Sequence, residues 1–378
     1  MNIACDIDDT LTESFDYFQP YVAEFFHADL NDLRKKNISY INLPDEWKDR
    51  EIPFYRAYFD KIVPDTTFKA GAAEAIARLK KEGHKIFIVT ARTKDFYTDP
   101  YYTSAKELVN GGISYDKLIC TFDKADACVK EGISVLIDDF PANCAAVNER
   151  GIPALLFTSK ANEACVCENR RVSSWKEAVV AVDQIYRGYP DKKYAAELLK
   201  EAEAVNPGRW GDHCRVAAFC AGRIAEACGM NAEKAEVLAL LHDIGRKFLI
   251  RDLGHIYNGY KYMQRMGFSA VARACLTHSF PSKNVSVYIG KPDIEPARAE
   301  ELKSLLSACE YDDYDRLIQL CDALASADGV VDVEARMADV KKRYGNYPQE
   351  QWDKNLELLG YFGQKAGKSV YEICGKAE

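Results

Sequence analysis

The chain has no apolar run long enough to span a bilayer, although 48% of its 378 residues are hydrophobic. It also lacks an excess of positive charge, and a net charge of −8 gives no general electrostatic reason to bind nucleic acid or an anionic membrane. Thirteen cysteines are scattered along it, and the close pair Cys165 and Cys167 does not have the spacing of a zinc knuckle. Because the first predicted strand begins beside Met1, no room is left for a signal peptide, and we expect free thiols in a cytoplasmic protein.

A chain of 378 residues is longer than one small domain, so we expect two. Up to about residue 188, short buried strands alternate with helical segments, which predicts a Rossmann-like α/β fold with a parallel sheet. The predicted strands are Asn2–Cys5, Lys85–Thr90, Lys117–Cys120, Val135–Ile137 and Ala154–Phe157. A linker is expected over residues 188–193, and an all-α domain over residues 194–378.

Four short fragments of the first domain combine residue types that phosphate chemistry needs. They are Asp6-Ile7-Asp8-Asp9-Thr10, Ile88-Val89-Thr90-Ala91-Arg92, Lys124 and Asp138-Asp139. Three of them follow apolar runs, and in an open α/β sheet ligands bind at the strand ends. Asp6 and Asp8 would lie on the same side of the chain, where two carboxylates can share a divalent cation.

Each fragment also has an ordinary structural explanation. Aspartates commonly cap turns and helices, Thr90 can cap a helix after its strand, and a single lysine such as Lys124 is usually a surface residue. Taken singly, these explanations are preferred. The four fragments together supply a nucleophile, a phosphate ligand, a cation and metal ligands, and that combination favours an active site.

With these fragments, the first half of the chain resembles a haloacid dehalogenase-type phosphatase, whose four motifs are present in order. The resemblance implies that Asp6 is the nucleophile and Asp8 the general acid and base. It also implies that Thr90 and Lys124 bind the transferring phosphoryl group, with Arg92 as a further substrate ligand. Mg²⁺ would be bound by four aspartates, namely Asp6, Asp8 through its carbonyl, Asp138 and Asp139. The stretch Ile88–Phe157 is similar to the 5′-nucleotidase and deoxyribonucleotidase branch.

Between the first and second fragments lies an insert, about residues 14–68, that is rich in aromatic residues. In the family that the chain resembles, an insert at this position is a small helical cap over the active site. Some of its aromatic side chains could stack on a substrate ring. We expect most of them to form the core of the cap, because a small domain needs large side chains to bury enough area.

Histidine is scarce, with six in the chain, yet four lie in the second domain. His242 and Asp243 follow the apolar segment Val237–Leu241, and Asp322 lies in an apolar helix where an unpaired carboxylate would be costly. A lone histidine is usually a structural residue. A His-Asp pair with His213 upstream and Asp322 downstream is a stronger signal, and its donors suit Fe, Mn, Co, Ni or Zn better than Ca.

This pattern of His, His-Asp and Asp resembles the HD superfamily of metal-dependent phosphohydrolases. The resemblance maps the metal ligands onto His213, His242, Asp243 and Asp322, and places Arg246 where many members have lysine. Some branches add two histidines between the pair and the last aspartate, and so bind two metal ions. His255 and His278 suit that pattern, so one or two transition-metal ions are expected. Alternatively, one or both of these histidines contact substrate phosphate or have no role in the site.

Together the motifs predict a two-domain phosphohydrolase. The first domain would hydrolyse a phosphomonoester, most simply a nucleoside monophosphate, through an aspartyl-phosphate, and the second a phosphate ester or anhydride with metal-activated water. One alternative makes the first domain a phosphatase of sugar phosphates or nucleic-acid 3′ ends. Another makes the second domain a nucleotide-sensing module. We expect a small phosphorylated metabolite as partner, with no membrane and no stable nucleic acid.

Overall fold

The computed structural model describes residues 1–375, which divide into two compact units. The first comprises Met1–Tyr186 with Arg265–Gly267, and the second comprises Arg187–Gln264 and the chain from Phe268 onward. The division at Arg187 falls beside the segment expected as a linker. Within the described range, none of the helices combines the length and the apolar character that crossing a membrane requires.

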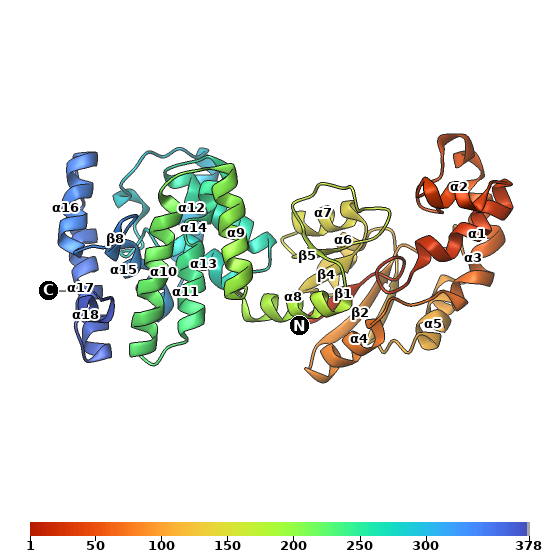
Figure 1. Ribbon diagram of the computed structural model, residues 1–378, viewed down its shortest axis with the longest axis horizontal. Helices are drawn as coiled ribbons and strands as arrows, with labels where there is room; N and C mark the ends of the chain where they lie inside the picture. The colour runs from red at the N-terminus through yellow and green to blue at the C-terminus, as the bar shows by residue number, and fades with distance from the viewer. Residues whose placement is uncertain (376–378) are drawn as a thin grey trace. The chain divides into compact units, whose positions relative to one another are not determined.

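The first unit is built on a six-stranded sheet in the order β3-β2-β1-β4-β5-β6, in which all neighbours are parallel (Figure 1). Its strands are β1 Asn2–Cys5, β2 Lys85–Thr90, β3 Lys117–Cys120, β4 Val135–Asp138, β5 Ala154–Phe157 and β6 Arg170–Val172. The predicted α/β class is confirmed. The sequence did not indicate β6, because this edge strand has three residues, two of them arginines, and no apolar run.

Helices cover both faces of this sheet, which explains why its central strands β1, β2, β4 and β5 are mostly apolar. They are α4 Ala72–Lys81, α5 Pro100–Asn110, α6 Lys124–Lys130, α7 Pro141–Glu149 and α8 Trp175–Arg187. Successive residues of a strand point to opposite faces. Ile3 and Cys5 pack in the core that includes α4 and α8, whereas Ala4 packs in the core that includes α6 and α7. Because helices cover both faces of the sheet, a ligand can reach it at the carboxyl ends of its strands.

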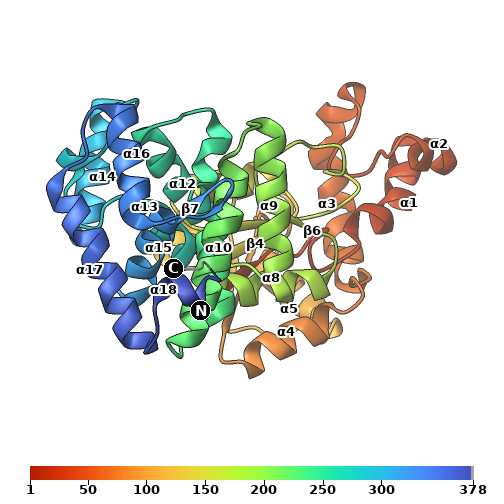
Figure 2. The same ribbon diagram turned by 60° about the vertical axis from the view of Figure 1, so that its left-hand side comes forward.

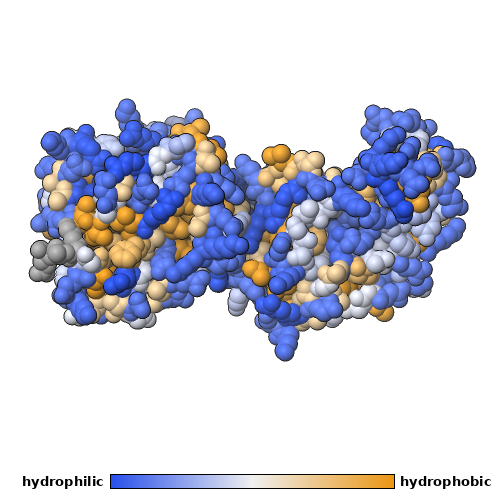
Figure 3. Space-filling model, viewed as in Figure 1, coloured by the Kyte–Doolittle hydropathy of each residue, from blue (hydrophilic) through white to orange (hydrophobic). Residues whose placement is uncertain are grey.

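The insert is a helical cap whose two ends are joined by an antiparallel bridge between Thr12 and Phe68. Its elements are α1 Ser14–Phe26, α2 Leu30–Lys35, η1 Asp45–Arg50, α3 Glu51–Ile62 and η2 Val63–Asp65. Phe18, Phe54 and Phe59 are buried together in one core. The outer surface of these helices is mostly hydrophilic (Figure 3, right-hand side). The prediction that most of the aromatic residues form the cap's own core is therefore confirmed.

The second unit is mostly helical. Its helices are α9 Lys192–Val205, α10 Trp210–Ala227, α11 Ala232–Leu241, α12 Leu253–Arg265, α13 Ser269–Thr277, α14 Pro296–Ala308, α15 Asp313–Leu324, α16 Val333–Tyr344, α17 Gln349–Ala366 and α18 Val370–Ile373, with 3-10 turns η3 Ile244–Phe248 and η4 Val285–Val287. The helix α10 packs against α11 and α15, and α16 and α17 also contact α15 (Figure 2).

The expected helical character of this unit is confirmed, and a short strand pair lies among its helices. The helix α15 ends at Leu324, and the chain then enters a short antiparallel hairpin of β7 Ala325–Ser326 and β8 Gly329–Val330. Gly329 has a φ of 135°, a backbone conformation that L-residues rarely adopt. The hairpin redirects the chain from α15 into α16.

Candidate active sites

The first candidate site lies at the carboxyl ends of β1, β2 and β4, which are neighbours in the sheet. Asp6 follows β1, Thr90 ends β2 and Asp138 ends β4, while Lys124 begins α6. The Lys124 Nζ lies 2.8 Å from Asp6 Oδ1 and 2.7 Å from Asp138 Oδ2. A buried ammonium group thus links the predicted nucleophile to a predicted metal ligand. The structure brings together residues that lie more than a hundred positions apart in the sequence.

Three carboxylates of this site are close enough to share a cation. One oxygen each of Asp6, Asp138 and Asp139 lies within 4.8 Å of the others, and all three residues are buried. Burial, together with the charges of Asp138 and Asp8, raises the pKa of Asp6 to about 7, although Lys124 opposes the shift. Burial and the neighbouring aspartates also raise the pKa of Asp139 well above its usual value. Such crowded oxygen donors fit a hard divalent cation such as Mg²⁺.

Asp8 is held by Arg92, the residue that the resemblance assigned to substrate binding. The Arg92 guanidinium donates from Nε to Asp8 Oδ2 at 3.0 Å and from Nη2 to Asp8 Oδ1 at 2.8 Å. Its Nη1 donates to Glu107 on α5 at 2.5 Å. Burial opposes ionisation of Asp8, but Arg92 outweighs that effect and holds the pKa of Asp8 below its usual value. Since every nitrogen of Arg92 is engaged, this geometry favours a positioning role, and direct substrate contact stays a prediction.

Asp9, which the sequence did not single out, ties the cap to the site. Its Oδ1 accepts from the backbone N–H of Phe15 at 2.7 Å, and its Oδ2 accepts from the Tyr40 hydroxyl at 3.1 Å. Asp9 has a φ of 54°, in the left-handed region that aspartate tolerates better than most residues. Burial raises the pKa of Asp9 to about 7. The aspartate run beside Asp6 was visible in the sequence, but the partner in the cap was not.

The second candidate site brings all six predicted ligands of the second unit into two groups of three. His213, His242 and Asp322 form one group, and Asp243, His255 and His278 form the other, each with ligand atoms within 4.8 Å of one another. We call these groups the first triad and the second triad. His242 and Asp243 are also within that distance of each other, so Asp243 can link the two.

All four histidines turn the same ring atom toward the centre of the cluster. In each ring, Nδ1 lies against a backbone carbonyl: at 3.2 Å from Ala325 for His213, 2.6 Å from Ala239 for His242 and 2.9 Å from Cys275 for His278. The Nδ1 of His255 contacts the carbonyl of Asp252 in the same way. A carbonyl can only accept, so Nδ1 carries the proton and Nε2 offers its lone pair.

The electrostatics of the cluster suit a metal ion. The Nε2 atom of His242 is buried and has no hydrogen-bond partner among residues 1–375, although such atoms are normally satisfied. Burial lowers the pKa of His278 to about 3 and lowers that of His242, so both rings are neutral ligands at ordinary pH. Burial opposes ionisation of Asp322 and Asp243, but their histidine and arginine neighbours hold the pKa of both below the usual value. Neutral imidazoles and ionised carboxylates are the forms that bind metal.

The second triad depends on a close approach between η3 and α12. A Cβ atom added at Gly245 would lie 1.9 Å from the backbone oxygen of His255 and 2.5 Å from the backbone nitrogen of Gly259. The absence of a side chain at Gly245 thus lets the turn after Asp243 pack directly on the helix that carries His255. The His255 Nε2 then reaches Asp243 Oδ1 at 2.8 Å.

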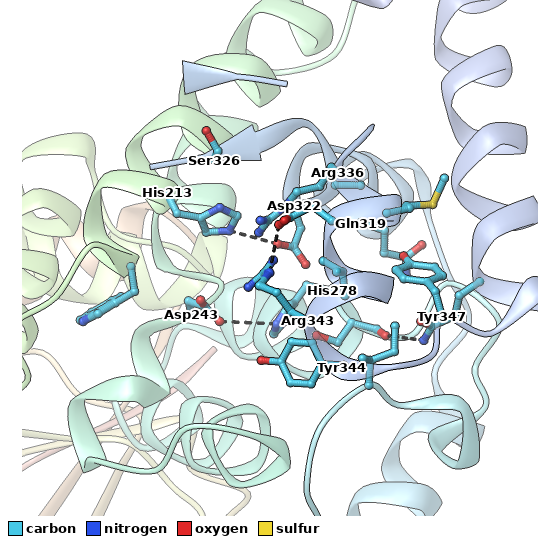
Figure 4. Close-up of a pocket in the computed structure, with 18 of the residues that line it drawn as sticks. His213, Asp243, His278, Gln319, Asp322, Ser326, Arg336, Arg343, Tyr344 and Tyr347 are labelled. Atoms are coloured by element: carbon cyan, nitrogen blue, oxygen red, sulfur yellow. Dashed lines mark hydrogen bonds and ion pairs between the residues drawn. The ribbon is translucent and has the colours of Figure 1, made fainter. Parts of the chain in front are cut away.

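The triads open into a cavity of about 720 Å³ in the second unit. Figure 4 shows His213, Asp322, Asp243 and His278 facing this cavity, with Arg336, Arg343 and Tyr344 projecting from α16. A volume of this size is in the range of small-molecule sites, roughly 300–1,000 Å³. Arginines and tyrosines line it alongside the metal ligands.

Residues 210–327 match the family model of the HD domain. No curated protein matches the chain. Among solved structures, a predicted phosphatase from Clostridium acetobutylicum is 19% identical, with 48% of this chain and 98% of that chain covered and a TM-score of 0.37. A haloacid dehalogenase-like hydrolase from Streptococcus pneumoniae is 14% identical, with 48% and 97% covered and a TM-score of 0.36. D,D-heptose 1,7-bisphosphate phosphatase from B. bronchiseptica, complexed with magnesium and phosphate, is 12% identical, with 49% and 99% covered and a TM-score of 0.30.

The segment matched by the HD model contains all six predicted ligands, from His213 to Asp322. Several of the similar solved structures are described as haloacid dehalogenase-like hydrolases, and each covers about half of this chain. Residues 210–327 therefore match an HD domain, and the six predicted ligands of the second unit lie within that match.

Proposed function

We propose that the chain is a cytoplasmic enzyme with two separate hydrolytic sites for small phosphorylated metabolites. In the first unit the proposal is carried by Lys124, which is buried between Asp6 and Asp138 at the carboxyl edge of the sheet. In the second unit it is carried by the two triads at one cavity. Both arrangements place ionised groups where a phosphate ester and divalent cations can meet.

In the first unit, an Asp6 oxygen attacks phosphorus and displaces the alcohol of a phosphomonoester, which takes a proton from Asp8. Water then attacks the aspartyl-phosphate and gives a proton to Asp8, so Asp6 and inorganic phosphate are released. Lys124 stabilises the negative charge of the phosphoryl oxygens, and Thr90 donates to one of them. Arg92 keeps Asp8 in place and favours its ionised form, which suits the second step. Mg²⁺, bound by Asp6, Asp8 through its carbonyl, Asp138 and Asp139, would neutralise further charge when present.

In the second unit, the triads gather four imidazole Nε2 atoms and two carboxylates as ligands for metal ions beside the cavity. One or two transition-metal ions bound there would lower the pKa of a water molecule and polarise the phosphate. Arg246 donates to Asp243 Oδ2 at 2.6 Å and so fixes the carboxylate that can link the triads. No covalent intermediate is required.

For the first unit we propose a nucleoside monophosphate as substrate, because the motifs are similar to the nucleotidase branch and the cap contains many aromatic rings. Sugar phosphates and nucleic-acid 3′ ends are the alternatives, and the acidic net charge disfavours the latter. The similar heptose phosphatase acts on a sugar bisphosphate, so sugar phosphates are included among the substrates to be tested. The alternative for the second unit is a module that binds nucleotide without turnover.

The test is phosphate release by the full-length protein, with Mg²⁺ or Mn²⁺, from nucleoside monophosphates, sugar phosphates and nucleoside diphosphates. Asp6→Asn keeps the shape of the nucleophile and should abolish the activity of the first site only. His242→Asn should abolish the activity of the second site only. Asp126→Asn and His27→Asn make the same changes at exposed positions and should leave both activities intact.

The assignments of the first and the second site can be refuted independently of each other. Turnover that survives Asp6→Asn and His242→Asn unchanged would remove both assignments. If phosphate is released by the first site alone while nucleotide still binds the second unit and His242→Asn abolishes that binding, the sensing module replaces the second enzyme.

A further inference from the structure

The charges that line the cavity of the HD domain balance before any metal ion binds. Five arginines and five aspartates line it, with neither lysine nor glutamate among the lining residues: Arg209, Arg246, Arg251, Arg336, Arg343, Asp243, Asp252, Asp322, Asp328 and Asp339. Each divalent ion bound by a triad would therefore add two positive charges that the lining does not offset. A phosphomonoester supplies only about −1.5 to −2 at neutral pH. With both triads filled, a second phosphate group would bring the charge of the occupied site closer to neutral, even when a metal-bound hydroxide contributes one negative charge.

Two of the five arginines are available to bind that group. Arg246 pairs with Asp243, Arg209 with Asp328, and Arg343 with Asp339. In the part of the chain that the structure describes, the guanidinium groups of Arg251 and Arg336 have neither a carboxylate nor a hydrogen-bond partner. A cation at a cavity wall without a partner in the protein is suited to an anion of the ligand.

Arg336 belongs to a part of the chain that the HD family model does not cover. The match ends at residue 327, whereas α16 begins at Val333 after the hairpin. In Figure 4, α16 presents Arg336 and Arg343 beside the pair of His213 and Asp322. Arg336 is half-buried there, on a helix that lines the cavity but lies outside the segment matched by the HD model.

We propose that the HD site takes a substrate with at least two phosphate groups, and that Arg336, assisted by Arg251, binds the group that is not hydrolysed. The proposal rests on the proposed hydrolytic function of the same site. It makes Arg336 a specificity-determining residue, because a monophosphorylated ligand would leave its guanidinium without a partner. A nucleoside diphosphate and a hexose bisphosphate share this chemistry.

The test uses calorimetric binding of inorganic pyrophosphate and of inorganic phosphate to the full-length, Mn²⁺-loaded protein. Arg336→Gln should weaken pyrophosphate binding about tenfold and leave phosphate binding within about twofold. Arg251→Gln should act in the same direction with a smaller effect, because Arg251 is exposed. Lys342→Gln removes the same charge from the same helix at an exposed position outside the cavity lining, and should change neither affinity.

Turnover then identifies the source of the second phosphate. Arg336→Gln should raise KM for a nucleoside diphosphate or for a hexose bisphosphate, and leave KM for a monophosphate unchanged. Equal weakening of phosphate and pyrophosphate would assign Arg336 to the hydrolysed group and overturn the proposal, as would no change in either. If the binding difference is observed but His242→Asn abolishes no turnover, the hydrolytic assignment fails while the two-phosphate specificity stands.

Discussion

Replacing Lys124 with methionine should destabilise the first unit more than most single substitutions would. The Lys124 side chain is 2% exposed and lies 2.8 Å from Asp6 and 2.7 Å from Asp138. Methionine keeps much of the length and apolar stem but leaves these buried carboxylates without their cation. Removing one partner of a buried ion pair costs about 3–5 kcal/mol. The lost hydrogen bond to Asp138, at about 1.5–3 kcal/mol, and the lost ion pair with Asp6 together account for a cost of this order.

This loss can be measured by scanning calorimetry of the full-length protein. For a unit of this size, 1 kcal/mol shifts Tm by about 2–4 °C, so the transition of the first unit should fall by about 6–20 °C. Mg²⁺ at a hundred times its Kd should restore about 2.7 kcal/mol, because it supplies the missing positive charge to the same carboxylates. Lys130→Met changes an exposed lysine of the same helix and should leave Tm unchanged. A Lys124→Met protein that melts within a degree of the wild type would refute the argument that Lys124 compensates these carboxylates.

Two further predictions concern the HD domain. The wild type should carry two transition-metal ions per chain by elemental analysis, and His278→Asn should lower the number to about one. If the variant retains both ions, His278 is not a metal ligand. Gly245→Ala should lower stability by about 1–3 kcal/mol and reduce occupancy of the second triad, because its Cβ would meet the backbone of α12. Gly360→Ala, in a helix where nothing lies within 4 Å of the added Cβ, should leave metal content unchanged; equal metal content in both variants would contradict the close-packing argument.

The sequence predicted the parts of the fold that short apolar runs define. The strands from Asn2–Cys5 to Ala154–Phe157 each carry such a run, and parallel strands must align their carboxyl ends at one edge. From that geometric rule, the sequence predicts that Asp6, Thr90 and Asp138 lie near one another. The edge strand β6 and the hairpin after α15 lack apolar runs, so periodicity could not reveal them.

Contacts between residues far apart in the chain could not be predicted from the sequence, for a different reason. Glu107 is buried on α5 and pairs with Arg92, and Tyr40 donates to Asp9 from the cap. Each contact joins segments whose separation is set by tertiary packing rather than by local pattern. A buried acidic residue among Thr103, Ser104 and Leu108 is a signal that a charged partner exists, but it does not say which one.

The contacts between the imidazole rings and backbone carbonyls affect how the HD site binds metal ions. His242, His255 and His278 each use the carbonyl three residues earlier, so the turn that carries the ring also sets its orientation. The neutral carbonyls belong to the main chain, and no side-chain substitution nearby can remove them. The ligands are thus arranged as soon as their helices form, ahead of any ion. A preparation stripped by chelator should accept Mn²⁺, Fe²⁺ or Zn²⁺ in turn without refolding, which lets one sample of protein report the preference among them.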